Sequence, residues 1–410
     1  MLKKNKMILK KKLIFICVIL FSGIISEAQT SEFGLYQKAY SEYLQTHYDK
    51  ANTLLNKDNL QFAQDDKLYI LSGDVLYALN EFDKAAGRYL QAYKLKNKSV
   101  TLKIAECYAQ LNQPYKTVEY LKIYVKNPNK LLQSEINLFP AFSKIENSKA
   151  WINFRKENHY NSYEKKLDEA KYQISKNDYA TAFDILDKLI IKNKNRHRAY
   201  EMRGDILMTN KDYKNAANSY LHAAQIKKHN LKYKTKAADA FFKAEKYKQA
   251  DKIYAEIITD KYFNPEILKK KAKTDLELKK YDEAEKYLKL YLNNFPDDAE
   301  AYYLKGKIDL IRNENISALE NLNKALEKDS SKPYYFETCG DAFFKTQTYD
   351  SAIRSYSMAL DLNPALSEIW YKKGLTEIKL YKYAEACEDL NKAKSMNYNK
   401  ADDLLFKYCK

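Results

Sequence analysis

Residues 336–352 read FETCGDAFFKTQTYDSA, and residues 370–386 read WYKKGLTEIKLYKYAEA. Each stretch has glycine at its fifth position, Gly340 or Gly374, and alanine at its last. From residue 170 onward the fifth position is always small, and it holds Ala170, Gly204, Ala238, Ala272, Gly306, Gly340 and Gly374. Twelve residues later a second small position holds Ala182, Ala216, Ala250, Ala284, Ala318, Ala352 and Ala386. A fixed period of about 34 residues with two small positions predicts a stacked array of helical hairpins.

Close packing explains the small residues. Two antiparallel helices approach closely only where their side chains are small. Glycine inside a helix costs about 1 kcal/mol relative to alanine, so its recurrence there needs a packing reason. Nine residues after the first small position, where the second helix begins, most units have an aromatic residue, as at Phe82, Tyr179, Tyr213, Tyr247, Tyr281, Tyr349 and Tyr383. Sixteen residues after it comes a tyrosine or leucine, such as Tyr89, Tyr220, Leu322 and Tyr356.

This pattern resembles the tetratricopeptide repeat family, whose 34-residue helix-turn-helix motif has small and bulky positions in this order. The resemblance covers nearly all of the chain after residue 30. It implies an all-α fold, an α-solenoid of about ten helix-turn-helix repeats with a C-terminal capping helix. A cap is expected because a terminal repeat exposes an apolar face that must be covered.

The period divides the chain into five parts, of which the first, residues 1–28, is taken up below. Residues 29–128 hold the N-terminal repeats, with small positions at Ala39, Gly73 and Ala105. Residues 129–163 lack both small positions, and we interpret them as a degenerate repeat or a joint where the array bends. Residues 164–397 form the regular array of seven repeats, and residues 398–410 form the capping helix.

Residues 1–28 differ from the rest of the chain. Six lysines precede an apolar run over residues 13–25, and Ser26-Glu27-Ala28 offers small residues where a signal peptidase reads. We predict a secretory signal peptide cleaved near Ala28, with a retained anchor as the alternative. The run is too short for a membrane span, which needs about 20 apolar residues. The mature chain is therefore expected without a membrane span, in the periplasm or secreted.

The charge balance is basic but rich in lysine. The net charge is +17, and the signal segment contributes six lysines against one glutamate, so +12 remains. Arginine, which suits forked recognition of phosphate, occurs at only seven positions. Scarce arginine and export both argue against nucleic acid as a partner. Pentatricopeptide-like RNA recognition also conflicts with the repeat length and the alanine position.

Four cysteines remain after removal of the signal. Cys107 and Cys339 fall next to the first small position, where we expect burial. Cys387 lies on the last full repeat and Cys409 on the cap. Two free thiols are the starting expectation there, but an oxidising compartment permits a disulfide between Cys387 and Cys409.

Catalytic motifs are missing from the sequence. The five histidines are scattered over different repeats, and no cysteine pair has the spacing of metal ligands. The glycines serve helix packing, so no phosphate-binding loop is formed, and no nucleophile elbow occurs. We therefore expect a protein that is not an enzyme and that uses no cofactor.

A hairpin array offers a concave surface lined mainly by the first helix of each repeat. Counting from the small position predicts partner-binding residues on this surface. They are Lys236, Asp239, Lys243, Lys270, Lys273, Tyr303, Lys307, Asp341, Lys345, Tyr371 and Lys372. Some tetratricopeptide domains grip a C-terminal carboxylate with lysines and asparagines, but the matching places here include Glu201 and Asp205, so that clamp is absent.

The leading hypothesis is an exported, non-catalytic scaffold that binds cell-envelope or secretion proteins on its concave face. The alternative is a structural adaptor that holds an anionic envelope polymer through its lysine-rich surface. Binding of a polymer would fall steeply with salt, whereas capture of an apolar peptide would not.

Overall fold

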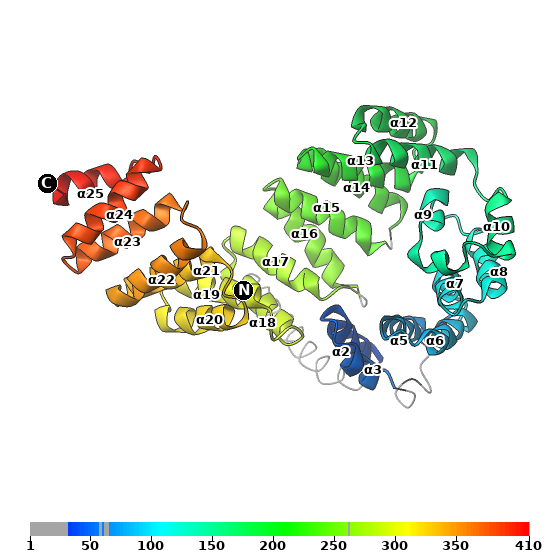
Figure 1. Cartoon of the computed structure of the whole chain (residues 1–410), viewed down its shortest axis with the longest axis horizontal. Helices are drawn as coiled ribbons and strands as arrows, with labels where there is room; N and C mark the ends of the chain where they lie inside the picture. The colour runs from blue at the N-terminus through cyan, green and yellow to red at the C-terminus, as the bar shows by residue number, and fades with distance from the viewer. Residues whose placement is uncertain (1–31, 57–59, 61–64, 229, 261–262, 410) are drawn as a thin grey trace, which may run out of the picture. The chain divides into compact units, whose positions relative to one another are not determined.

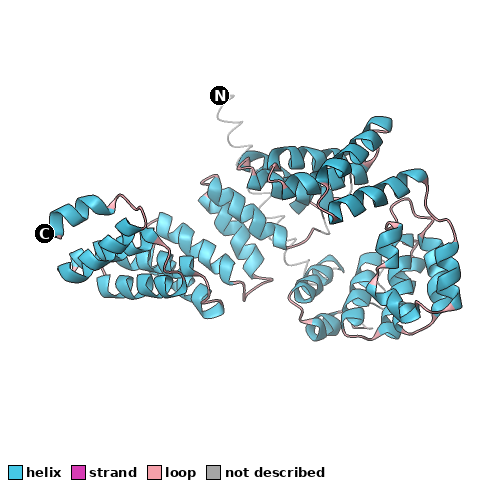
Figure 2. Ribbon diagram, turned by 45° about the horizontal axis from the view of Figure 1, so that its top comes forward, coloured by secondary structure: helices cyan, strands magenta, loops and turns pink. Residues whose placement is uncertain are grey.

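The structure is a computed structural model that describes residues 32–56, 60, 65–228, 230–260 and 263–409. The predicted signal segment lies outside these residues. The described part of the chain is built from helices, most of them paired as antiparallel hairpins, and contains no β-strand (Figures 1 and 2). The prediction of an all-α repeat solenoid is confirmed. The chain divides into two compact units, the first ending at Phe263 and the second starting at Asn264.

Three hairpins open the first unit. Their helices are α2 (Glu32–Leu44) and α3 (Tyr48–Leu54), α5 (Asp66–Ala78) and α6 (Phe82–Lys94), and α7 (Thr101–Gln110) and α8 (Pro114–Tyr124), with the short 3-10 helix η1 (Lys98–Val100) before α7. The small positions Ala39, Ala51, Ala85 and Ala105 are fully buried in them. This burial agrees with the packing role that the sequence assigns to these residues.

The joint segment, residues 129–163, forms no regular hairpin. It contains α9 (Gln133–Asn137), the 3-10 helix η2 (Pro140–Ile145) and α10 (Lys149–Lys156). Aromatic side chains fill its core, where Phe142 and Trp151 lie with ring centroids 5.2 Å apart. Large rings take the place of the missing small positions, because helices that lack Gly or Ala at their crossing cannot approach as closely.

Seven regular hairpins follow the joint segment. Those of the first unit are α11 (Ser162–Ser175) and α12 (Tyr179–Lys192), α13 (His197–Thr209) and α14 (Tyr213–Ile226), and α15 (Leu231–Lys243) and α16 (Tyr247–Ile258). Those of the second unit are α17 (Glu266–Glu277) and α18 (Tyr281–Leu292), α19 (Ala299–Ile311) and α20 (Asn315–Lys328), α21 (Pro333–Lys345) and α22 (Tyr349–Leu362), and α23 (Ser367–Lys379) and α24 (Tyr383–Ser395). The chain ends with the capping helix α25 (Ala401–Tyr408).

The second helices begin at the positions that the aromatic residues predict. Tyr179, Tyr213, Tyr247, Tyr281, Tyr349 and Tyr383 are each the first residue of such a helix. All seven alanines of the second small position, from Ala182 to Ala386, are completely buried. The hairpin spacing is therefore set by one tight contact on each helix.

The turns inside the hairpins use a left-handed residue. After α13, Lys211 has φ 60°, Asp212 N–H donates to Leu207 O at 2.9 Å, and Lys211 N–H donates to Met208 O. These two bonds form the Schellman motif that closes a helix C-terminus. The left-handed position of this motif, here Lys211, is usually taken by glycine. The same positive φ recurs once in each regular repeat, at Asn177, Lys211, Glu245, Lys279, Asn313, Gln347 and Tyr381.

Candidate functional site

The predicted partner-binding residues all lie on first helices, but they fall into two groups. Lys236, Asp239 and Lys243 belong to α15 in the first unit. The other eight belong to the second unit and lie on α17, α19, α21 and α23. We describe each group by itself.

In the first unit, Lys236 connects two neighbouring repeats. Its Nζ lies 2.9 Å from Glu201 Oε1 and 2.8 Å from Asp205 Oδ1, both on α13. The hydroxyl of Tyr220 donates to the same Asp205 oxygen at 2.6 Å. Burial alone would lower the pKa of Lys236, but the hydrogen bonds and charges of Asp205 and Glu201 raise it above its ordinary value. Lys236 therefore helps to hold α15 against α13.

The second unit contains the same arrangement. Lys372 on α23 lies 2.7 Å from Glu337 and 2.9 Å from Asp341 on α21, and Tyr356 donates to Asp341 at 2.8 Å. A tyrosine, an aspartate and a lysine thus link consecutive first helices. The lysine comes from the following repeat, so the contact aligns neighbouring hairpins as well as lining their shared face.

Other predicted residues of the second unit also contact the neighbouring first helix. Lys273 Nζ lies 2.5 Å from Glu300, and Lys345 Nζ donates to Leu310 O at 3.0 Å. Tyr303 stacks on Tyr335 with ring centroids 4.8 Å apart. In these repeats, residues predicted to bind a partner also contact the first helix of the neighbouring repeat.

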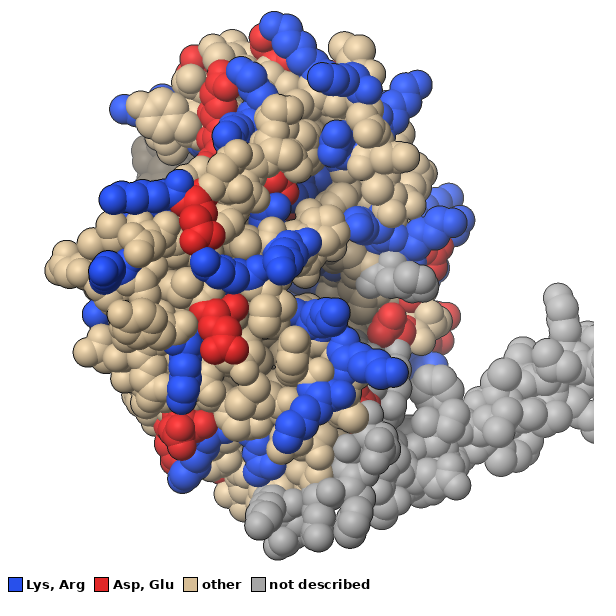
Figure 3. Space-filling model, turned by 90° about the vertical axis from the view of Figure 1, so that its right-hand side faces the viewer, with Lys and Arg blue, Asp and Glu red and all other residues tan. Residues whose placement is uncertain are grey.

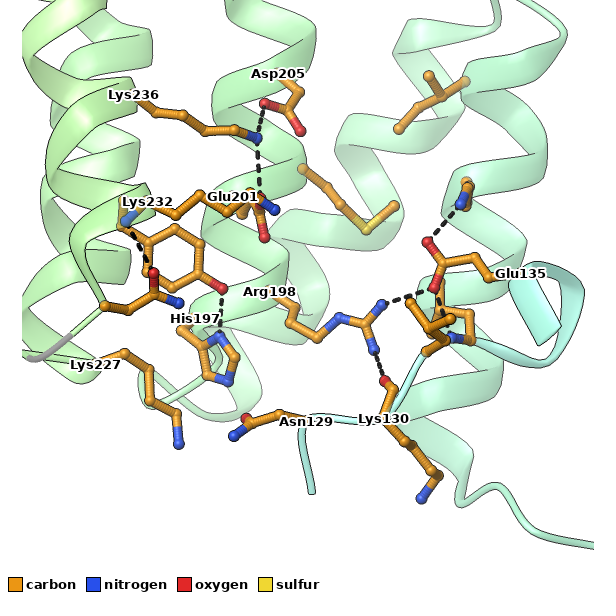
Figure 4. Close-up of a pocket in the computed structure, with 17 residues that line it drawn as sticks. Asn129, Lys130, Glu135, His197, Arg198, Glu201, Asp205, Lys227, Lys232 and Lys236 are labelled. Carbon is orange, nitrogen blue, oxygen red and sulfur yellow. Dashed lines mark hydrogen bonds and ion pairs between the residues drawn. The ribbon is translucent and has the colours of Figure 1, made fainter. Parts of the chain in front are cut away.

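One pocket of the first unit lies where the joint segment crosses the first helices. We call it the first-helix pocket; its volume is about 520 Å³ (Figure 4). Of the eleven predicted residues, Lys236 alone lines it. The others that line it are Asn129, Lys130, Leu131, Leu132, Glu135, Lys171, Ile174, His197, Arg198, Glu201, Met202, Asp205, Lys227, Asn230, Lys232 and Tyr233.

Sequence reasoning missed this pocket because it depends on the joint segment. The one available signal is the pattern Leu131-Leu132 followed by Glu135, an apolar pair and an acid inside a segment without small positions. Its partner Arg198 is one of the few arginines of the chain. Neither feature shows from which repeat the contact would come.

Arg198 and Lys171 hold the joint segment in place. Arg198 donates to Lys130 O at 2.7 Å and to Glu135 Oε2 at 3.3 Å, and Lys171 donates to Glu135 Oε1 at 2.5 Å. Burial alone would raise the pKa of Glu135, but the hydrogen bonds from Lys171 and the Leu132 N–H lower it overall. Glu135 is therefore a charged anchor at neutral pH.

His197 lies on the wall of the same pocket. Its Nδ1 is 2.9 Å from the hydroxyl of Tyr233. Burial, followed by the charges of Lys227 and Arg198, lowers the pKa of His197 to about 4. The ring is thus uncharged at neutral pH, so lysine and arginine supply the positive charge of the pocket.

The described residues contain no group of three histidine, cysteine or acidic side chains that could hold a metal ion. Cys107 and Cys339 are buried, and burial raises the pKa of each thiol to about 12. Thiols of this kind are poor nucleophiles because the reactive thiolate is disfavoured. Among the described helices, none combines the length and the apolar composition that a membrane crossing requires.

At the C-terminal end, Cys387 of α24 and Cys409, directly after α25, are joined as a disulfide with their Cα atoms 5.6 Å apart. This is the pair that the sequence analysis considered. Tyr383 and Tyr408 stack beside it, with ring centroids 5.8 Å apart. The bond attaches the capping helix to the last full repeat.

Comparison with known proteins identifies the repeats. The tetratricopeptide repeat model matches residues 167–230, 235–299 and 269–333. No curated protein matches the chain. Among solved structures, a tetratricopeptide repeat protein from Parabacteroides merdae is 18% identical, with 61% of this chain and 99% of that chain aligned at a TM-score of 0.48.

Two further structures extend the comparison. The APC/C hetero-tetramer Cut9–Hcn1 is 14% identical, with 93% of this chain and 84% of that chain aligned at a TM-score of 0.47. MamA is 22% identical, with 40% of this chain and 96% of that chain aligned at a TM-score of 0.37. The family match falls on hairpins whose buried small positions recur once in every repeat. Residues 167–230 and 235–333 therefore consist of tetratricopeptide repeats.

Proposed function

We propose that this chain is an exported, non-catalytic scaffold that binds segments of other proteins on the first-helix faces of its repeats. Tetratricopeptide repeats make it a scaffold for protein–protein interaction. Export, the absence of catalysis and cell-envelope or secretion partners are the further parts of the proposal. They rest on the signal-like N-terminus and on a sequence without catalytic motifs.

The observation that carries the proposal is the composition of the first-helix pocket. Six lysine and arginine side chains line it against three carboxylates, beside the apolar side chains of Leu131, Ile174 and Met202. A site of mixed apolar and basic character suits a peptide segment, whose side chains supply both contacts. We infer that this pocket is the partner-binding site of the first unit.

The polymer-binding alternative is less well supported. In Figure 3 acidic side chains lie between the lysines of the face on view, so positive charge is not continuous there. Many lysines are paired with an acid, as in the contacts of Lys122 with Glu157 and of Lys188 with Asp184. Paired lysines offer less free charge to a polyanion.

Localisation and partner binding need separate experiments. Mass spectrometry of the protein from its native cells tests export, and a mature N-terminus at Gln29 in the periplasm or medium is expected. An intact Met1 terminus on the protein in the cytoplasm would refute export.

Partner binding is tested by crosslinking and capture from native cells with the unchanged protein and with a Lys227→Glu, Lys232→Glu double variant. We expect the double variant to lose partners that a surface control, Lys214→Glu, retains. Lys214 is exposed on the second helix α14, outside the pocket. Recovery of the same partners by all three proteins would place the binding site elsewhere. If the double variant and Lys214→Glu both lost every partner at moderate salt, the result would favour the alternative, in which the lysine-rich surface binds an anionic polymer by charge.

A further inference from the structure

The joint segment lies against the first helices as a bound peptide would. Leu132 is 1% exposed and packs with Leu167 of α11 and Ala199 of α13. Three residues later, the carboxylate of Glu135 accepts hydrogen bonds from Lys171 and Arg198. The first-helix face of this unit therefore already holds one segment of the chain by an apolar residue followed by a carboxylate.

Main-chain and polar contacts complete this internal binding mode. Arg198 donates to the carbonyl of Lys130, one residue before the apolar pair. Ser134 donates its backbone N–H to Asp168 on α11 at 3.1 Å, and its hydroxyl donates to the same carboxylate. Contacts of this kind fix the direction of the segment, because they engage its backbone as well as its side chains.

The other side of the first-helix pocket offers the same types of group, and no segment among the described residues is bound to it. Figure 4 shows Lys227 and Lys232 on this side, opposite Arg198 and Glu135. Met202 supplies apolar surface to the pocket, whereas Tyr233 lines it but is only 4% exposed. Apolar and cationic groups thus continue from α13 to α15, next to the groups that hold residues 130–135.

Charge pairing separates the two sides. Glu135 is shared by Lys171 and Arg198, and Glu201 is shared by Lys232 and Lys236. The ammonium of Lys227, just after α14, makes no ion pair with any residue that the structure describes. His197 beside it is neutral at neutral pH and does not compete for an anion. One half-buried cation of the pocket is therefore available for a carboxylate of another molecule.

We propose that the first-helix pocket binds a partner protein segment in which an apolar pair is followed, three residues later, by a carboxylate that pairs with Lys227. The proposal rests on the proposed function and specifies the partner's chemistry. The bound segment runs beside residues 130–135 and uses the same kinds of contact. Its apolar residues meet Met202, and its carboxylate meets Lys227.

The test uses a peptide of known sequence. A fluorescein-labelled peptide KLLQSEI, which copies residues 130–136, is titrated with the whole purified protein, and binding is followed by fluorescence anisotropy. A control peptide KLLQSQI replaces the carboxylate with an amide of the same shape. The protein variants are Lys227→Glu, Lys227→Arg and the surface control Lys214→Glu, each checked for helicity by circular dichroism.

A charge-assisted contact of this kind predicts at least about tenfold weaker binding of KLLQSEI to Lys227→Glu, with Lys227→Arg and Lys214→Glu close to the unchanged protein. Both peptides are amidated at the C-terminus and carry the same label, so they differ only in the side-chain carboxylate. KLLQSQI is expected to bind about equally to the unchanged protein and to Lys227→Glu, because it lacks that side-chain carboxylate. If the effect of Lys227→Glu depends in this way on the glutamate of the peptide, the contact joins that carboxylate to Lys227.

Three outcomes would overturn the proposal. One is the absence of saturable binding up to about 1 mM peptide, and another is equal binding of the two peptides. The third is equal binding of KLLQSEI to the unchanged protein and Lys227→Glu, as expected if the peptide displaced residues 130–135 instead. Any of these together with capture of cellular partners by the unchanged protein would refute the peptide chemistry alone, whereas failure of the unchanged protein to capture any partner would refute the scaffold function.

Discussion

The ring of Tyr89 occupies the space that a Cβ atom on Gly73 would need, with ring carbons 2.4 to 2.8 Å from that position. Its hydroxyl donates to Asp74, the residue after this glycine, at 2.6 Å. The same relationship joins Gly204 to Tyr220 and Gly340 to Tyr356. Each glycine thus lets a large aromatic ring of the second helix close the hairpin.

Gly73→Ala is expected to destabilise the first unit by about 1–3 kcal/mol, since the ring must move or the helices must separate. Gly87→Ala is the matched control in the same hairpin, because a Cβ atom there would meet no atom within 4 Å beyond its own stretch of helix. That change should stabilise α6 by up to about 1 kcal/mol through helix propensity. Thermal and urea unfolding measure both, and equal effects of the two substitutions would contradict the packing argument.

Lys236 is expected to contribute to stability as well as to the binding face. A double-mutant cycle of Asp205→Asn and Lys236→Met should give a coupling of up to about 1 kcal/mol, because both side chains are partly solvated. Raising the salt concentration should reduce the coupling. Denaturant unfolding of the four proteins measures it. Strict additivity at low salt would show that the link between α13 and α15 does not contribute to stability.

Reduction is expected to loosen the end of the array. Cys387 and Cys409 are 22 residues apart. Closing a loop of that size lowers the entropy of the unfolded chain and stabilises the folded state by about 3 kcal/mol. Hydrogen exchange of α25 should therefore accelerate in reductant while α21 and α22 stay unchanged. A Cys387→Ser, Cys409→Ser variant should exchange equally fast with and without reductant. Alkylation of both thiols in the unreduced protein would show that the bond is not formed.

Glu377 is expected to make the second unit less stable as pH rises. It is buried and shares Lys373 with Asp389. Burial, together with the charge of Asp389, raises the pKa of Glu377 to about 7, from an ordinary value of 4.5. Between these values the folded chain keeps a proton that the unfolded chain has released, so stability is lost as pH rises through this window.

Glu377→Gln removes this proton dependence. The variant should melt at a higher temperature than the unchanged protein at pH 8 and at a similar temperature at pH 5. Glu368→Gln, an exposed change on the same helix α23, is the control and should leave the pH dependence in place. Parallel melting curves of Glu377→Gln and the unchanged protein between pH 5 and pH 8 would argue against the raised pKa.

The repeat positions could be predicted because they reflect contacts inside one hairpin or between successive hairpins. Ala216 and Tyr220 meet α13 within the same repeat, so the repeat period records their environment directly. The left-handed turn residues were not predicted, since Lys211, Glu245 and Gln347 are not glycines and give no sequence signal. Their conformation follows from the closure of the hairpin around them.

The candidate site could be predicted only in part. Lys236 lies in the first-helix pocket as well as on a first helix, whereas Lys273, Lys345 and Lys372 pair with neighbouring repeats. Counting positions along a helix predicts on which side of the helix a residue lies. It does not tell whether the next repeat supplies a partner for that side chain, because this depends on the residue that stands opposite.

The sequence by itself determined the helical hairpins, their spacing and the small residues at each crossing, because these depend on contacts that repeat at a fixed distance along the chain. Tertiary structure alone decided where the joint segment lies. Arg198 meets the carbonyl of Lys130 across 68 residues, and Lys130 belongs to a segment that lacks the small positions of the repeats. The pocket forms because a non-repeating segment packs back on the repeats, and packing of that kind is set by the folded surface as a whole.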